Sequence, residues 1–352
     1  MAHPEETAVI ELRNVWKVFG ARADAAMQAI QAEGLSKAQV LERFDCVVGV
    51  ADASFSVPKA EIFCIMGLSG SGKSTLVRHI NRLLEPTSGQ ILVDGVDIMK
   101  SSDEELRAIR SQNIGMVFQN FALLPHRTVR DNVALPLEIQ GLTKSERWDL
   151  AQKSIDLVEL SGWEDKFAHE LSGGMQQRVG LARALAADPD VLLMDEAFSA
   201  LDPLIRRQLQ DQFLKLSQEM RKTTIFITHD LDEAIRIGHR IAIMKDGAIV
   251  QIGTPDQIIT EPADDYVADF VAGISRLKLV YAHSIMQPVT EALIAEIGPI
   301  EAFPAVDGGD DLDRIIDAAV AANSPLQVMA DGNLAGVITN KDIMLGIQGG
   351  KE

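Results

Sequence analysis

The stretch IFCIMGLSGSGKST, residues 62–75, decides the fold of the larger part of this chain. Its first five residues, 62–66, are apolar throughout, which is typical of a parallel strand buried on both faces. Glycines follow in a short loop, and the continuation as far as residue 84 has helical spacing. A strand, a glycine-rich loop and a helix in this order predict a loop that binds phosphate groups.

The residues of this loop have the types that phosphate binding requires. Glycines let the backbone pass close to phosphate oxygens, and the helix that follows adds N–H groups and the positive end of its dipole. We expect Lys73 to neutralise the β- and γ-phosphates of a nucleotide and Ser74 to hold Mg²⁺. Further phosphate contacts are expected from Gly67, Ser69, Gly70, Gly72 and Thr75.

Two carboxylates follow a second apolar strand, VLLMD at residues 191–195. Asp195 ends this strand, where its carboxylate can reach Mg²⁺ through water. Glu196 comes next and is the candidate general base for an attacking water. Together with the phosphate-binding loop, this pair predicts that a bound nucleotide is hydrolysed.

The segment LSGGMQQR, residues 171–178, contains a second anion site. Ser172, Gly173 and Gly174 precede a helical run, so a hydroxyl and free N–H groups are expected at a helix N-terminus. One chain does not need two anion sites for one γ-phosphate. Two chains that face each other head to tail do, because the loop of one and the LSGG segment of the other can hold the same ATP.

With these motifs in this order, the chain resembles the ATPase subunits of ABC transporters over about residues 8 to 273. Walker A corresponds to Gly67–Ser74, Walker B to Val191–Asp195, and the signature motif to Leu171–Gln176. The resemblance implies a P-loop ABC ATPase core with an inserted helical subdomain. It also implies ATP and Mg²⁺ as cofactors and a homodimer of ATPase subunits.

The resemblance assigns further residues. Gln119, in MVFQN, matches the Q-loop position that contacts Mg²⁺ and water and senses the permease, and His229 matches the switch histidine. Ser199–Asp202 matches the D-loop. The implied catalytic residues are thus Glu196, His229 and Gln119. The implied Mg²⁺-binding residues are Ser74, Gln119 and Asp195. Contacts to ATP from outside the glycine loop are implied for Phe19, Ser172, Gly173, Gly174, Gln176 and Asp202.

Phe19 is assigned by the resemblance to stack on adenine, which is a contact that any aromatic face can make. It stands just before a turn at Gly20, at the end of the alternating stretch 9–20. Trp16 is the competing aromatic in the same stretch, and a residue at the end of a strand is otherwise often part of the core.

Length, charge and composition limit the classes of protein. The 352 residues suggest about two domains, and an apolar content of 47% is that of a globular protein. A formal net charge of −18 argues against a nucleic-acid binder, which needs a basic face. Two cysteines, Cys46 and Cys64, suggest a reducing cytosol rather than a disulfide framework. We expect neither a signal peptide nor a membrane-spanning stretch.

Local patterns divide the chain into segments. Residues 9–20 are expected to form an edge strand, and 22–45 a helical insertion of two short helices divided by Gly34, with Ser36 as an N-cap. Buried strands alternating with helices predict a doubly wound α/β core, interrupted by a helical subdomain at about 127–188. Further expected elements are a helix at about 203–221, a strand at 223–229 and a hairpin at 241–253. The ATPase domain is expected to cover 1–275.

Two features narrow the resemblance to the glycine betaine/proline (quaternary amine) uptake family. One is the insertion 22–45, together with the stretches 62–75 and 80–98. The other is GVITNKDIM at 336–344, which resembles the strand-to-helix element of a CBS domain. Thr339 and Asp342 match positions that often hold ribose or phosphate in that family, although an ordinary β–α turn explains them equally well. We expect 276–352 to be a small α+β domain with a single or truncated CBS-like unit, where the family often has two.

This resemblance implies partners and a location. The ATPase would energise uptake through separate membrane permease subunits, at the cytoplasmic face of the inner membrane, with a periplasmic or surface substrate-binding protein as an indirect partner. The cargo stays open among glycine betaine, choline, proline, proline betaine, histidine and trimethylamine N-oxide.

Two alternatives belong to other functional classes. A non-transport ABC ATPase of DNA repair, chromosome organisation or translation would carry long coiled coils or two cassettes, and neither pattern is visible in the sequence. A regulatory nucleotide-binding module without turnover would not need the set of Asp195, Glu196 and His229. No nucleic-acid partner is expected.

Overall fold

The computed structural model describes residues 8–119, 121–199, 201–272, 280–330 and 332–348. The chain forms two compact units, residues 1–250 and 251–352. The domain boundary expected from the sequence, near Arg276, lies outside the described residues. Each unit is described by itself below.

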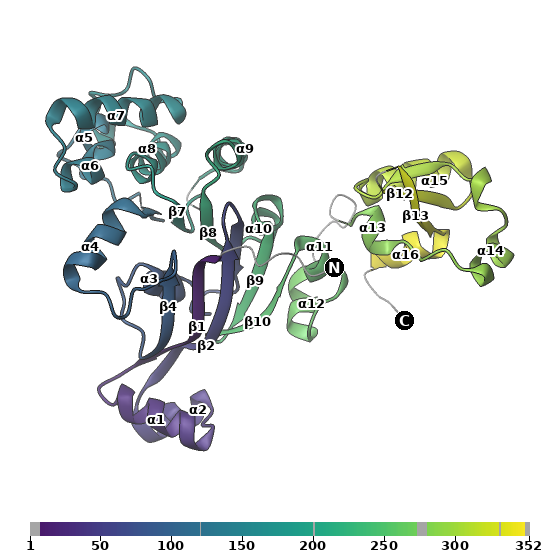
Figure 1. Cartoon of the computed structure of the whole chain (residues 1–352), viewed down its shortest axis with the longest axis horizontal. Helices are drawn as coiled ribbons and strands as arrows, with labels where there is room; N and C mark the ends of the chain where they lie inside the picture. Colours follow the sequence, from purple (N-terminus) through teal and green to yellow (C-terminus); the bar gives the residue numbers. More distant parts are fainter. Residues whose placement is uncertain (1–7, 120, 200, 273–279, 331, 349–352) are drawn as a thin grey trace. The chain divides into compact units, whose positions relative to one another are not determined.

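A six-stranded sheet forms the centre of the first unit (Figure 1). Its strand order is β10-β9-β3-β8-β7-β6, and β9, β3, β8, β7 and β6 pair in parallel. The strands are β3 Ile62–Met66, β6 Ile114–Val117, β7 Val191–Asp195, β8 Thr223–Thr228, β9 Arg240–Lys245 and β10 Ala248–Gly253. Every residue of β3, β7 and β8 is buried, as the apolar runs predict.

A four-stranded antiparallel sheet, in the order β2-β1-β4-β5, lies in the same unit. Its strands are β1 Ala8–Phe19, β2 Val47–Pro58, β4 Ser88–Val93 and β5 Val96–Asp97. The expectation of an edge strand at 9–20 is wrong, because β1 pairs with β2 on one side and β4 on the other. Alternating apolar and polar residues indicate that a strand has one buried and one solvated face. Inner and edge strands of an antiparallel sheet both meet this condition, so the pattern does not distinguish them.

The insertion between β1 and β2 consists of α1, Ala23–Glu33, and α2, Lys37–Phe44. Gly34 ends α1 in the left-handed conformation (φ 67°), and Ser36 caps α2 in a capping box with Gln39. Apolar side chains of both helices form a small core with the facing ends of β1 and β2. Trp16 packs against this core.

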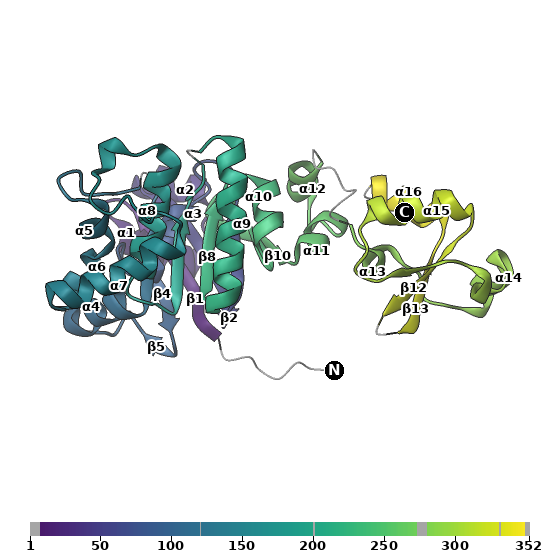
Figure 2. The same ribbon diagram turned by 90° about the horizontal axis from the view of Figure 1, so that it is seen from above.

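Helices between β6 and β7 form the helical subdomain, in which α5, α7 and α8 contact one another. They are α5 Val129–Val133, α6 Leu135–Ile139, α7 Lys144–Leu157 and α8 Gly173–Leu185, with a 3₁₀ turn at Ala168–Glu170. The other helices of this unit are α3 Lys73–Ile80, α4 Asp103–Gln112, α9 Pro203–Met220 and α10 Leu231–Ile237. Figures 1 and 2 show α8 and α9 next to each other, and the two helices are in contact.

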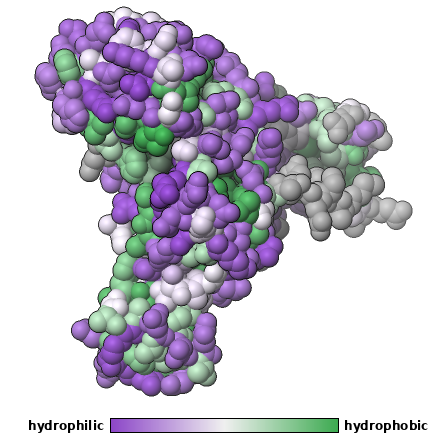
Figure 3. All heavy atoms as spheres, turned by 60° about the vertical axis from the view of Figure 1, so that its left-hand side comes forward, coloured by the Kyte–Doolittle hydropathy of each residue, from purple (hydrophilic) through white to green (hydrophobic). Residues whose placement is uncertain are grey.

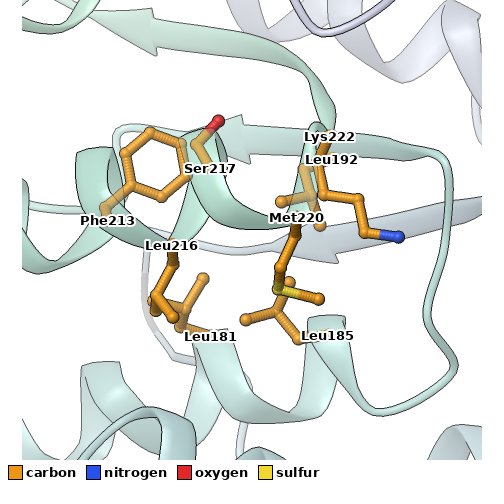
Figure 4. Close-up of a pocket in the computed structure, with 8 residues that line it drawn as sticks. All are labelled: Leu181, Leu185, Leu192, Phe213, Leu216, Ser217, Met220 and Lys222. Atoms are coloured by element: carbon orange, nitrogen blue, oxygen red, sulfur yellow. The ribbon is translucent and has the colours of Figure 1, made fainter.

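A small apolar cavity of about 10 Å³ lies between α8, α9 and β7 (Figure 4). Leucines of all three elements line it together with Phe213 and Met220. The Lys222 ammonium, at the rim, forms an ion pair with the Asp188 carboxylate at 2.6 Å. A volume of roughly 10 Å³ just admits one water, which would find few polar partners here, so the cavity is a packing void rather than a ligand site.

The second unit contains a three-stranded sheet in the order β11-β12-β13, with β11 and β12 parallel and β12 and β13 antiparallel. The strands are β11 Ala305–Asp307, β12 Leu326–Ala330 and β13 Asn333–Ile338. Its helices are α11 Pro255–Thr260, α12 Asp265–Val271, α13 Ala282–Ile285, α14 Glu291–Ile297, α15 Leu312–Ala322 and α16 Asn340–Gln348, with a 3₁₀ turn at Ile300–Ala302.

Hydrophilic side chains cover most of the face drawn in Figure 3, with smaller apolar groups between them. Within the described ranges, no helix combines the length and the hydrophobicity that crossing a bilayer requires. Cys46 and Cys64 are both buried and free.

Phe226, on β8, is fully buried, and its ring lies 5.7 Å from that of Phe198. We predict that Phe226→Ala lowers the free energy of unfolding by about 3–5 kcal/mol, because the substitution removes buried apolar surface and leaves a cavity. Urea denaturation followed by tryptophan fluorescence measures this. The matched control, Leu41→Ala at a half-exposed position of α2, should stay within about 0.5 kcal/mol. A loss for Phe226→Ala no larger than that of the control would contradict the packing described here.

Candidate functional site

The glycine loop follows β3 and leads into α3, so the predicted strand, loop and helix are all present. Gly72 caps α3 with φ 98°, a left-handed conformation, and a Cβ there would lie 2.4 Å from the Gly49 carbonyl oxygen. A Cβ on Gly67 would lie 2.2 Å from the Met244 carbonyl oxygen. Glycine is therefore required at both positions by the close approach of other backbone segments.

Lys73 is the first residue of α3, and only 5% of its surface is exposed. Its ammonium donates to the carbonyl oxygens of Gly67, at 2.8 Å, and Leu68, at 3.1 Å. Burial lowers the pKa of this ammonium from its ordinary value, while the nearby Glu196 and Asp195 carboxylates oppose that shift. The loop thus holds a buried cation beside two acids.

Ser74 and Asp195 meet although 121 positions separate them in sequence. The Ser74 hydroxyl donates to Asp195 Oδ1 at 2.9 Å, and Arg78 Nη2 lies 3.6 Å from Asp195 Oδ2. Hydroxyl and carboxylate oxygens are the ligands that Mg²⁺ takes in proteins, so this donor set fits the metal expected from the sequence.

Two of the predicted catalytic side chains converge on one carboxylate oxygen of the third, Glu196. Gln119 Nε2 donates to Glu196 Oε2 at 3.0 Å, and His229 Nδ1 lies 3.3 Å from the same oxygen. The Glu196 backbone is left-handed (φ 47°), and its N–H donates to the carbonyl oxygen of Ile227 on β8. Residues that follow β6, β7 and β8 thus meet at one edge of the sheet.

An open cleft of about 390 Å³ is lined by the glycine loop, by one of these side chains and by the predicted aromatic. Phe19 and Glu196 both line the cleft. The other lining residues are Val47, Val48, Gly49, Ser69, Gly70, Gly72, Lys73, Ser74 and Thr75. Phe19, 39% exposed, lines the cleft, while Trp16 packs into the core of the insertion, so the structure distinguishes the two aromatics.

The signature segment stands at the start of α8. The Ser172 hydroxyl caps this helix by accepting from the Met175 N–H, and the Gln176 amide donates to the carbonyl oxygens of Ala168 and Leu171. A Cβ on Gly174 would lie 2.7 Å from Ile205 Cγ2, while Gly173 has open space around it. Among the described residues that line the cleft, none comes from this segment.

The D-loop position is described in part, because Ala200 lies outside the described residues. Asp202 caps α9 by accepting from the Ile205 N–H at 3.1 Å. Like the signature residues, Asp202 does not line the cleft of its own chain.

Sequence reasoning missed Gly49 and Arg78. A Cβ on Gly49 would lie 2.5 Å from Cε2 of the Phe19 ring, so only glycine leaves the ring in its place against β2. A glycine inside the alternating stretch 47–57 was the available signal, since such a glycine often marks a close approach. Arg78 gave no comparable signal, because its partner Asp195 is distant in sequence.

Residues 50–199 match the family model described as ABC transporter. The glycine betaine/proline betaine transport system ATP-binding protein ProV of Escherichia coli is 51% identical over 304 residues, which are 86% of this chain and 76% of that protein. The glycine betaine transport ATP-binding protein OpuAA of Bacillus subtilis is 49% identical over 342 residues, covering 93% of this chain and 81% of that protein.

Among solved structures, the chain is similar to a dimeric ATP-binding cassette in a post-hydrolysis state bound to ADP and phosphate. The TM-score is 0.59 and the sequence identity 32%, and the match covers 70% of this chain and 98% of the other. The α/β fold of an ABC ATPase is thereby confirmed. The chain belongs to the ABC transporter family, and it is an ATP-hydrolysing, ATP-binding protein of a transport system.

Proposed function

We propose that the chain works as a homodimer that energises uptake of a betaine-type quaternary amine through separate permease subunits. The main observation behind this proposal is that the two predicted anion sites of one chain are not in the same cleft. The cleft holds the glycine loop, Lys73 and Glu196, whereas the signature residues Ser172–Gly174 lie outside it. A second copy facing head to tail would bring its own signature segment to this cleft.

Within the cleft, the residues support hydrolysis of ATP by an activated water. Glu196 would accept the proton of the attacking water, with Gln119 and His229 holding its carboxylate in place through Oε2. Lys73 would exchange its loop carbonyls for phosphate oxygens, and Phe19 would stack on the base. Ser74, Asp195 and Gln119 would hold Mg²⁺, which supplies neutralisation of phosphate charge.

We infer that the helical subdomain contacts the permease. Gln119 follows β6 and precedes α5, so a change at the Glu196 carboxylate could reach this subdomain through one short segment. We place the chain at the cytoplasmic face of the membrane, attached through the permease, because the relatives are named as ATP-binding proteins of transport systems. The substrate-binding protein would then be an indirect partner, outside the membrane.

The names of the two relatives support the cargo class. Both name glycine betaine, and one also names proline betaine. These compounds carry a permanent cation and a carboxylate. The recognition of both groups would lie in the permease and the binding protein, so this chain supplies the energy and not the selectivity.

We propose further that the second unit is CBS-like and single. Its order β11, α15, β12, β13, α16 includes the predicted strand-to-helix element at 336–344. Asp342 Oδ2 accepts from the N–H and the hydroxyl of Thr339, and its Oδ1 accepts from Gln287 Nε2. Both carboxylate oxygens are therefore used inside the unit, which favours a structural role for Asp342.

One experiment tests the transport assignment directly. The tagged chain is recovered from its native membrane, and the ATPase activity of the recovered complex is assayed with a panel of betaines and amino acids. We expect a multispanning permease, and stimulation by one quaternary amine together with its binding protein. Recovery without a membrane partner would overturn the transport role.

We predict that Glu196→Gln lowers ATP turnover by about 10²–10⁴-fold, because the amide cannot accept the proton of the attacking water. The variant should accumulate as an ATP-bound dimer in size-exclusion chromatography with Mg²⁺ and ATP. Glu219→Gln, at an exposed position of α9, is the control and should turn over ATP normally. Normal hydrolysis by Glu196→Gln would show that another group is the base.

Lys73→Ala should weaken ATP binding by about 10–100-fold, because one or more charge-assisted hydrogen bonds to phosphate are lost. Isothermal titration with a non-hydrolysable ATP analogue measures the affinity. Lys59→Ala removes an exposed lysine of the same unit and should bind the analogue like the parent chain. Unchanged affinity of Lys73→Ala would overturn the assignment of the loop.

Gly49→Ala should weaken ATP binding about tenfold by displacing the Phe19 ring from its place, since stacking of a base on an aromatic contributes about 1–3 kcal/mol. Inosine triphosphate and ATP should be affected alike, because stacking is insensitive to the base. Ser56→Ala, at an exposed position of the same strand, is the control. Parent-like affinity would mean that Phe19 is not the platform for the base.

A further inference from the structure

The first turn of α9 carries Arg206, whose guanidinium group is hydrogen-bonded to the backbone of the D-loop and of Phe198, the residue before it. Nε donates to the carbonyl oxygen of Phe198, and Nη2 donates to those of Ser199 and Leu201, each at 3.2 Å. Three carbonyl groups bound to one rigid, planar side chain leave this stretch little freedom to change shape unless Arg206 moves with it.

The same guanidinium also contacts the switch segment, by which we mean residues 228–230 around the switch histidine. Arg206 Nη1 lies 3.3 Å from Asp230 Oδ2, and Asp230 is the residue that follows His229. The Asp230 N–H donates at 3.0 Å to the hydroxyl of Thr228, the residue that precedes His229. Both neighbours of the switch histidine are thus fixed, one of them directly by Arg206.

The buried carboxylate of Glu233 links the switch segment to α9 through hydrogen bonds. Glu233, 5% exposed, accepts hydrogen bonds from the Thr228 hydroxyl and, at 2.9 Å, from Gln210 Nε2, one turn along α9 from Arg206. Burial raises the pKa of the Glu233 carboxyl above its ordinary value. Both carboxylate oxygens have partners, so α9 and the switch segment are joined by a satisfied polar network as well as by the Arg206 pair.

The turn also packs on the signature helix. Ile205, next to Arg206, lies so close to Gly174 that a Cβ on the glycine would be 2.7 Å from Ile205 Cγ2. One turn of helix therefore contacts the start of α8, the D-loop and the switch segment. In the proposed dimer, the signature serves the ATP of the partner, whereas His229 serves the ATP of its own chain.

We propose that Arg206 is a positioning residue that makes the two ATP sites of the dimer respond to each other, by holding the D-loop and the switch histidine in one rigid unit with the signature helix. This inference rests on the proposed homodimer with shared ATP. It predicts that movement of the signature on to the partner's ATP sets the position of His229 beside Glu196. Arg206 itself is not among the described residues that line the cleft.

Steady-state ATP hydrolysis by the full chain, measured against ATP concentration, tests the proposal. The parent chain should show a Hill coefficient near two for its two coupled sites. Arg206→Ala should bring the coefficient close to one and lower kcat about tenfold, with the half-saturating ATP concentration changed less than about threefold. Arg207→Ala removes the adjacent, exposed arginine of the same turn and should behave like the parent.

A double-mutant cycle separates positioning from general destabilisation. If Arg206 acts through the switch histidine, adding Arg206→Ala to His229→Ala should lower kcat no further. Arg206→Lys and Asp230→Asn, which keep a cation and a helix cap respectively, guard against loss of folding and should each give intermediate Hill coefficients.

The outcomes are distinguishable. A cooperative parent with equally cooperative Arg206 and Asp230 variants, or additive losses in the cycle, overturns the role of Arg206 and leaves the dimer intact. A non-cooperative parent whose Glu196→Gln variant forms no ATP-bound dimer overturns the shared-ATP arrangement, and the coupling with it.

Discussion

The glycine loop keeps its shape because the backbones of two other segments press against it. Gly72 packs on the carbonyl group of Gly49 in β2, and Gly67 packs on that of Met244 in β9. The Gly247 N–H, in the turn between β9 and β10, donates to a carbonyl oxygen of the loop at 2.9 Å. The loop is therefore held from both sides, and the buried Lys73 and the start of α3 take their positions from it.

The remaining chemistry depends on the parallel sheet. Because parallel strands all end at the same edge, residues that follow different strands meet there. β7 ends at Asp195 and is followed by Glu196, β8 is followed by His229, and Gln119 lies just beyond β6. The side chains come from distant parts of the sequence, yet two of them lie within 3.3 Å of one Glu196 oxygen. The network around Arg206 extends this arrangement to α9.

The insertion between β1 and β2 is separate from this chemistry. Among the described residues, the cleft takes its lining from the ends of β1 and β2, the glycine loop, the start of α3 and the residue after β7, and none from α1 or α2. The insertion has its own small core, and the second unit has its own sheet.

The sequence by itself determined the buried strands, the glycine loop, the acids after VLLMD and the signature, because each combines residue types with one local backbone geometry. The helices of the insertion were predictable for the same reason, through Gly34 and Ser36. Only the tertiary structure decided that 9–20 is an inner strand, that Phe19 rather than Trp16 faces the cleft, and that Arg206 joins two loops. These outcomes depend on which distant segments pair, and local periodicity contains no information about the partner.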